Sequence, residues 1–239
     1  MADAQSILGH LRAVEAERRH RQAAPEFAAR VHALKAYQQR RFAHTYRDLL
    51  DSLRYAAAAR FFLDELYGPR DFSHRDQQFA RVVPALVRLF PQDIVDTVET
   101  LAQLHALSET LDSSMASHLD GVRIDAADYA RAWRATGHAD ARERQIRLTV
   151  DVGRTLDRLT RNPLLRHSLR MMRGPARGAG LAELQRFLEA GFDTFKALRG
   201  AGEFLRTIGD RERELAARLF APDAGCDAAA LREALGQLP

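Results

Sequence analysis

Residues Pro25–Tyr67 read PEFAARVHALKAYQQRRFAHTYRDLLDSLRYAAAARFFLDELY, and after Pro25 no proline or glycine interrupts this stretch. Apolar side chains recur along it at steps of three and four residues, the period of an α-helix with one buried face. The stripe consists of Phe27, Val31, Leu34, Phe42, Leu49, Leu53 and Ala56. An unbroken helix would be about 60 Å long at 1.5 Å per residue. That is long for a globular domain, so we expect a bend near Ala43–Tyr46.

The same period continues on both sides of this stretch, and no segment alternates in the manner of a β-strand. The breaks between helices are short. Gly68-Pro69 is a helix stop, and Ser73 with Asp76 resembles a capping box. Further boundaries are expected at Pro91, Asp125, Asn162-Pro163 and Gly200-Ala-Gly202. The sequence therefore predicts an all-α protein, a single bundle of seven to nine helices. We divide it into a basic N-terminal helix (1–24), a main bundle (25–221) and a tether with a short C-terminal helix (222–239).

Composition excludes several classes of protein. Cys226 is the only cysteine, so an intramolecular disulfide and cysteine-based metal clusters are excluded. The sequence has neither a signal-like apolar region at its start nor a run of about 18 apolar residues that could span a bilayer. We therefore expect a cytoplasmic protein that does not bind membranes.

Positive charge is concentrated near the N-terminus. Arginine supplies 34 of the 36 basic residues, a skew typical of GC-rich genomes. Residues 1–50 contain nine Lys and Arg against five acids, an excess that equals the formal net charge of +4 for the whole chain. The simplest interpretation is the solvated face of an amphipathic helix. A narrow apolar stripe on the same helix also predicts self-association or a protein partner; it comprises Ile7, Leu8, Leu11 and Val14.

A third interpretation of the basic region is nucleic-acid binding through residues 12–41. Arg18, Arg19 and Arg21 could contact phosphates there. However, aromatic stacking residues and a recognisable helix-turn-helix are both lacking. Binding to a membrane surface is disfavoured because the apolar face has neither Trp nor Phe.

The segment Phe61-Phe62-Leu63-Asp64-Glu65-Leu66-Tyr67, followed by Gly68-Pro69, resembles the signature of the bacterial FFLEELY motif proteins. Asp64 stands where the signature has Glu. The proteins of this group have a similar length, so the resemblance implies a likeness over most of the chain. It implies no reaction and no catalytic residue. On a helix these aromatics occupy adjoining faces, which favours a buried core element. The alternative is a pocket lined by Asp64, Glu65, Tyr67, Arg70, Asp71 and His74.

A second candidate site is the segment Arg173–Gly180, which combines arginines and glycines before a helix whose amides would attract an anion. The side chains and glycines expected there are Arg166, Arg170, Arg173, Arg177, Gly178 and Gly180. The alternative is a flexible surface connection. Because a helix rather than a strand precedes it, this segment is not a phosphate-binding P-loop.

Signatures of common enzymes are missing from the sequence. We find no nucleophile elbow, Walker A motif, HExxH motif or dinucleotide-binding glycine pattern. Glu17 and His20 form the only Glu-x-x-His of the kind that di-iron bundles need twice. His105 with Glu109, and Asp71 with His74, are isolated pairs, and His105 alone could hold a haem. We expect no metal and no cofactor.

The leading hypothesis is a non-enzymatic interaction or scaffold protein that self-associates. The alternatives are a binder of small anions at Arg173–Gly180, with or without enzymatic activity, and a nucleic-acid binder.

Overall fold

The computed structural model describes residues 2–66, 69–221 and 238–239. Within these ranges the chain is helical and contains no strand, which confirms the predicted all-α class. It forms more helices than the seven to nine expected, because several breaks produce short helices. The elements are α1 (Ala4–Gln22), α2 (Pro25–Thr45), α3 (Arg47–Asp51), α4 (Ala56–Phe61), η1 (Phe62–Leu66, a π-helical turn), α5 (Ser73–Leu89), α6 (Gln92–Ala116), α7 (Ala126–Thr136), α8 (Ala139–Leu159), α9 (Pro163–Met171), α10 (Arg173–Gly178), α11 (Ala182–Ala197) and α12 (Gly202–Phe220).

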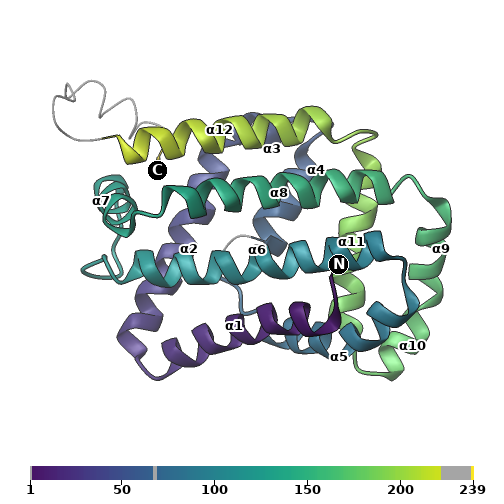
Figure 1. The fold of residues 1–239 in the computed structure, drawn as a ribbon. Helices are drawn as coiled ribbons and strands as arrows, with labels where there is room; N and C mark the ends of the chain where they lie inside the picture. The colour runs from purple at the N-terminus through teal and green to yellow at the C-terminus, as the bar shows by residue number, and fades with distance from the viewer. Residues whose placement is uncertain (1, 67–68, 222–237) are drawn as a thin grey trace.

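The long helices form a layered bundle. In Figure 1, α12, α8, α6 and α1 lie one above another, and neighbours in this series pack against each other. Helix α2 crosses behind this layer and contacts α6. Helix α7 packs on α6 and α12 at one end of the bundle, and α9, α10 and α11 lie at the other end. None of the described helices is long and apolar enough to cross a membrane.

The stretch from Pro25 to Tyr67 is not one helix. The break at Tyr46, which separates α2 from α3, confirms the bend predicted near Ala43–Tyr46. A second break was not predicted: Ser52 is extended, and its hydroxyl accepts hydrogen bonds from the amides of Arg54 and Tyr55 at 3.3 Å. Leu53, placed on the buried stripe by its spacing, is fully exposed in this turn. The helical period fails there because the serine hydroxyl replaces helical hydrogen-bond partners.

Local signals predicted most of the other boundaries. Asp125 caps α7 in a capping box with Asp128, and Gly137, with φ of 67°, ends that helix. Ser73 was expected to cap α5, but the helix begins at Ser73 itself, and the Asp71 carboxylate accepts a hydrogen bond from the Ser73 amide at 2.8 Å.

The expectation of a loop at Arg173–Gly180 was wrong, because most of this segment forms the short helix α10. Its Pro175 lies in the first turn, where a helix tolerates proline. Helix α6 ends at Ala116. Apart from Leu238 and Pro239, the predicted tether and helix at 222–239 lie outside the described residues.

Three clusters of buried apolar side chains hold the bundle together. One joins α2, α3 and α4 to α11 and α12 around Phe62 and Phe204. A second lies between α2, α6, α7 and α12 around Tyr129 and Trp133. The third packs α1 against α5 and α6 around Ile7. Between them lies a region that is partly polar.

Candidate functional site

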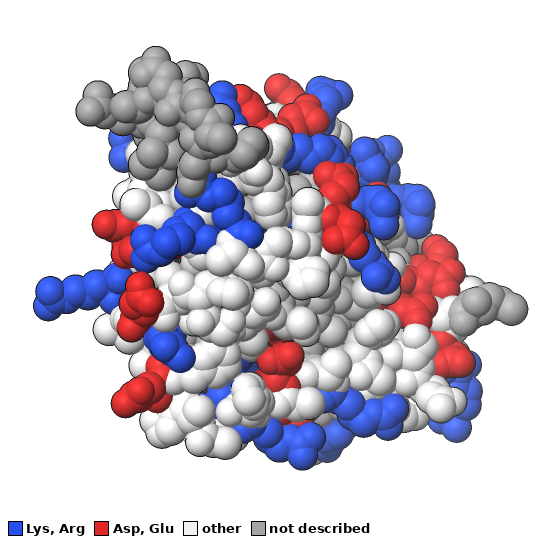
Figure 2. All heavy atoms as spheres, turned by 60° about the vertical axis from the view of Figure 1, so that its left-hand side comes forward, with Lys and Arg blue, Asp and Glu red and all other residues white. Residues whose placement is uncertain are grey.

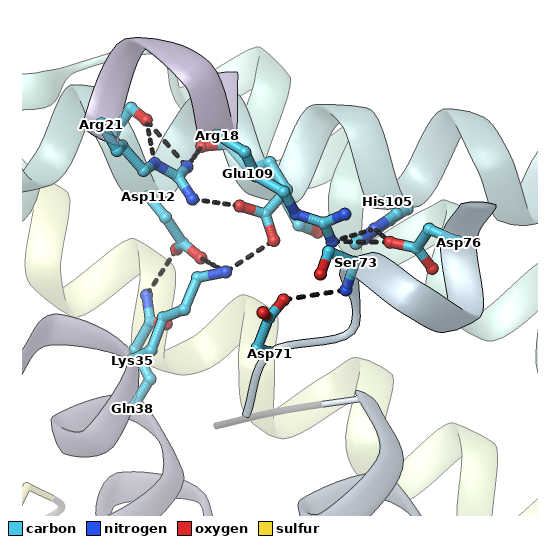
Figure 3. A network of polar contacts seen from close by, with 12 residues as sticks. Arg18, Arg21, Lys35, Gln38, Asp71, Ser73, Asp76, His105, Glu109 and Asp112 are labelled. Carbon is cyan, nitrogen blue, oxygen red and sulfur yellow. Dashed lines mark hydrogen bonds and ion pairs between the residues drawn. The ribbon is translucent and has the colours of Figure 1, made fainter. Parts of the chain in front are cut away.

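Several basic residues of α1 and α2 turn toward the interior. Arg21, which is 8% exposed, donates to the hydroxyl of Ser113 at 2.9 Å and to the main-chain carbonyl of Glu109 at 2.6 Å, and it also pairs with the Glu109 carboxylate. Lys35 donates to the same carboxylate at 2.5 Å and lies 3.9 Å from Asp112. Figure 3 shows α1 and α2 supplying these cations to acids of α6.

The same network extends to α5. Asp76 accepts from Arg18 at 2.6 Å and from His105 at 2.8 Å. Burial raises the pKa of Asp76, but the hydrogen bond and charge of His105, followed by the charges of Arg75 and Arg18, lower it to about 2. We call Arg18, Arg21, Lys35, Gln38, Asp76, His105, Glu109 and Asp112 the buried charge network (Figure 3).

Glu109 and Asp112 are three residues apart on α6, so they lie on one face of the helix, and both are buried. Burial raises the pKa of Glu109, but Lys35 and then Arg21 lower it to about 2. Asp112 behaves in the opposite way: burial raises its pKa, and the charge of Lys35 opposes that rise only in part. Its carboxylate accepts a hydrogen bond from Gln38 at 3.0 Å.

A cavity of about 190 Å³ lies beside this network. Its polar wall includes Lys35, Gln38, Asp76, Glu109 and Asp112. The remaining wall is mostly aliphatic and aromatic, with side chains from α5, α6, α8 and α11 that include Phe79, Leu101, Leu104, Ile146, Phe187 and Leu188. We call this space the central cavity.

One end of the central cavity carries polar atoms without partners. Within the described part of the chain, the Tyr129 hydroxyl, the Trp133 Nε1 and the Arg41 Nε are buried and have no hydrogen-bond partner. The three residues are 0%, 6% and 3% exposed. Buried polar groups are nearly always hydrogen-bonded, and leaving one unpaired costs about 1–3 kcal/mol. We call these three residues the donor end of the cavity.

Neighbouring residues hold the donor end in place. Tyr129 and Trp133 are one turn apart on α7, with ring centroids 5.9 Å apart. Tyr37 stacks on Tyr129 at 4.8 Å, and the Arg142 guanidinium lies 4.0 Å above the Trp133 ring. Arg41 pairs with Glu212, which also accepts a hydrogen bond from the hydroxyl of Tyr46 at 2.7 Å. Burial raises the pKa of Tyr129, so its hydroxyl stays protonated and can donate.

The predicted motif pocket is only partly assembled. Glu65 is buried, lines the central cavity and accepts a hydrogen bond from Arg186 at 3.0 Å. Arg70 donates to the carbonyl of Asp64 at 3.2 Å, on the exposed side of the motif. Asp71 and His74 do not meet: Asp71 bonds Ser73, whereas the exposed His74 lies 2.8 Å from Glu183. Tyr67 lies outside the described residues.

Two of the four arginines of the predicted anion site pair with acids of α11. Arg173 donates to Glu189 through two hydrogen bonds of 2.6 Å, and Arg166 lies 2.8 Å from Asp193. Arg170 and Arg177 are exposed, as are Gly178 and Gly180. One amide at the start of α11 is also occupied, because Leu184 donates to Gln78 at 2.9 Å. These pairs reduce the positive potential on which the anion prediction depends.

The metal pairs considered from sequence do not form a site. His105 bonds Asp76, while Glu109 bonds Arg21 and Lys35. Among the described residues, no group of three or more His, Cys, Asp or Glu is arranged to hold a metal ion.

The apolar stripe expected to mediate self-association is largely inside the fold. Ile7, Leu11 and Val14 are 0%, 8% and 1% exposed, and they pack against α5 and α6. Self-association stays a prediction, but this stripe is not the exposed surface that could mediate it.

Two of the three arginines expected to contact phosphates are likewise engaged internally, since Arg18 pairs with Asp76 and Arg21 with Glu109. Arg19 is exposed. Figure 2 shows basic and acidic side chains interspersed on the face it presents, around a mostly uncharged middle. That face carries no continuous basic stripe of the kind that tracks a nucleic-acid backbone. Nucleic-acid binding also stays a prediction.

Sequence reasoning missed the central cavity and its donor end. Tyr129 and Trp133 follow the apolar period of α7, so nothing in the sequence distinguishes them from ordinary core residues. Arg41 was counted only as part of a basic stretch. The available signal was the position of Arg41, which follows Leu34 and Tyr37 by seven and four residues and so shares their face of α2.

The comparisons with known proteins identify a family and no activity. A model of a family described as a domain of unknown function (DUF8198) matches residues 17–225, so the chain belongs to that family. No curated protein and no solved structure matches it. The matched range contains the donor end and all of the buried charge network.

Proposed function

We propose that this protein binds a small organic molecule in the central cavity, and that binding rather than scaffolding is its main role. The observation that carries the proposal is a cavity of about 190 Å³ in the middle of the bundle, with an apolar wall facing a set of buried polar groups. Binding sites for small molecules typically combine a concave apolar surface with a few convergent polar groups.

The size of the cavity supports this proposal. An engineered apolar cavity of about 150 Å³ in another protein binds benzene, so about 190 Å³ accommodates a molecule of that size or slightly larger. The polar wall supports it as well. Glu109 and Asp76 have strongly lowered pKa values beside the cavity, and such perturbed groups cluster at functional sites.

The proposal can be tested with toluene as the probe. A ligand that binds only the folded state raises the melting temperature, so we expect saturating toluene to raise that of the wild-type protein. Leu104→Phe should reduce the shift because Leu104 lines the cavity and the larger ring takes up part of its volume.

Leu107→Phe is the matched control. Leu107 is also a partly buried leucine of α6, but it does not line the cavity. This variant should keep the toluene shift. The proposal fails if toluene does not stabilise the wild-type protein, or if Leu104→Phe and Leu107→Phe respond alike.

A further inference from the structure

The donor end of the central cavity has a specific chemical requirement. A Trp Nε1–H and an Arg Nε–H can only donate hydrogen bonds, and a protonated Tyr hydroxyl can donate one as well. All three belong to residues that are more than nine-tenths buried, and all three residues line the cavity. A ligand that satisfies them must present hydrogen-bond acceptors at this end.

A group with two acceptor atoms fits this arrangement better than a single carbonyl, because the donors come from two different helices. Tyr129 and Trp133 approach from α7, and Arg41 approaches from α2. A carboxylate has two oxygens and about four lone-pair sites, so it can accept from both directions at once.

The charged groups around the donor end balance one another, so the preference for an ionised ligand rests on the strength of its hydrogen bonds. The cations facing Tyr129 are Arg41 and Arg142, and the acids facing it are Glu212 and Asp112. Glu212 is already paired with Arg41 and bonded by Tyr46. Burial raises the pKa of Asp112, and the charge of Lys35 offsets this rise only in part. Hydrogen bonds to an ionised acceptor are about twice as strong as neutral ones.

Resting on the proposed function, we infer that the central cavity binds an organic acid of low molecular mass. Its carboxylate accepts hydrogen bonds from Arg41, Tyr129 and Trp133. A compact apolar body of about the size of benzene contacts the adjoining wall, which includes Ile146 and Ile208. Benzoate is the simplest probe with this shape and charge.

The experiment compares benzoate with toluene and benzylamine, which share the ring but carry no charge or a positive charge. Trp133 is the only tryptophan in the chain, so its fluorescence reports directly on this end of the cavity, and calorimetry gives the dissociation constants. We expect benzoate to bind at least about tenfold more tightly than either other probe, the effect of one charge-assisted hydrogen bond or more.

Single substitutions locate the carboxylate. Tyr129→Phe keeps the ring and removes the donor, so it should weaken benzoate about tenfold and leave toluene binding unchanged. Trp133→Phe, followed by calorimetry, should act in the same direction. Tyr37→Phe is the matched control: its ring stacks on Tyr129, but its hydroxyl donates to the carbonyl of Pro239 at 3.1 Å and it does not line the cavity. It should bind benzoate as the wild-type protein does.

The possible results separate this inference from the proposed function. If toluene binds but benzoate has no advantage, or if Tyr129→Phe leaves benzoate affinity unchanged, the carboxylate inference is wrong and the cavity still binds small molecules. The second result is also the one expected if a buried water satisfies the donors. If none of the three probes binds, both proposals fail.

Discussion

Replacing Glu109 by Gln removes the carboxylate that Arg21 and Lys35 both contact, and it keeps the shape of the side chain. Glu109 is 5% exposed, and Arg21 is 8% exposed. The substitution leaves buried cations without their partner. Breaking a buried ion pair in this way costs about 3–5 kcal/mol.

The lowered pKa of Glu109 gives a second measure of the same interaction. A fall from 4.5 to about 2 corresponds to ~3.4 kcal/mol of stability at neutral pH, at about 1.4 kcal/mol per pH unit. Because the folded-state pKa is the lower one, this stability is fully present above about pH 4.5 and is lost as the pH falls through about 2. At pH 3, ~1.4 kcal/mol of it remains by the same relation.

Urea unfolding at pH 7 and pH 3 measures both effects. At pH 7, Glu109→Gln should unfold with a free energy lower by about 3–5 kcal/mol. At pH 3 the difference between the two proteins should be ~2 kcal/mol smaller, because the other carboxyl groups titrate in both proteins and cancel.

The control is Glu214→Gln, which breaks an exposed ion pair with Arg218 at 2.6 Å and should cost less than about 1 kcal/mol. A loss below about 1 kcal/mol for Glu109→Gln at pH 7 would refute the reasoning. A difference that does not change with pH would refute it equally.

Four further substitutions test how the bundle is packed, capped and charged. Gly153→Ala should destabilise the fold by about 1–3 kcal/mol, because the new Cβ would lie 2.3 Å from a methyl of the buried Leu205. Gly9→Ala should instead stabilise the fold by about 0.5–1 kcal/mol, because no atom lies within 4 Å of the new Cβ. Asp125→Ala should cost about 1 kcal/mol through loss of the α7 cap. Arg173→Ala should cost less than about 1 kcal/mol, because its pair is exposed. Thermal unfolding measures the change in stability for each variant. A change of opposite sign would contradict the role given to the corresponding residue.

The local signals that succeeded share one physical basis. The Asp125 cap and the helix start at Pro163 depend on groups within a few residues of each other. Such interactions can be inferred from spacing alone. The second break near Ser52 escaped prediction because the hydroxyl competes with a helix that the apolar period would otherwise favour.

The basic N-terminal region shows the limit of this reasoning. Sequence located the positive charge correctly but assigned it to the surface. The structure turns Arg21 and Lys35 toward Glu109, which is more than 70 residues further along the chain. Whether a charge faces solvent or a buried partner depends on which helices pack together, and local spacing carries no information about that.

The sequence by itself determined the helical class, most helix boundaries and the exclusion of several enzyme families, because each depends on short-range periodicity, caps and motifs. Only the tertiary structure decided which residues form the central cavity. Arg41 on α2 meets Tyr129 and Trp133 on α7 because both helices pack on α6 and α12. Their unpaired donors are a property of that packing, since a polar atom is left without a partner only once neighbouring helices have excluded water from it.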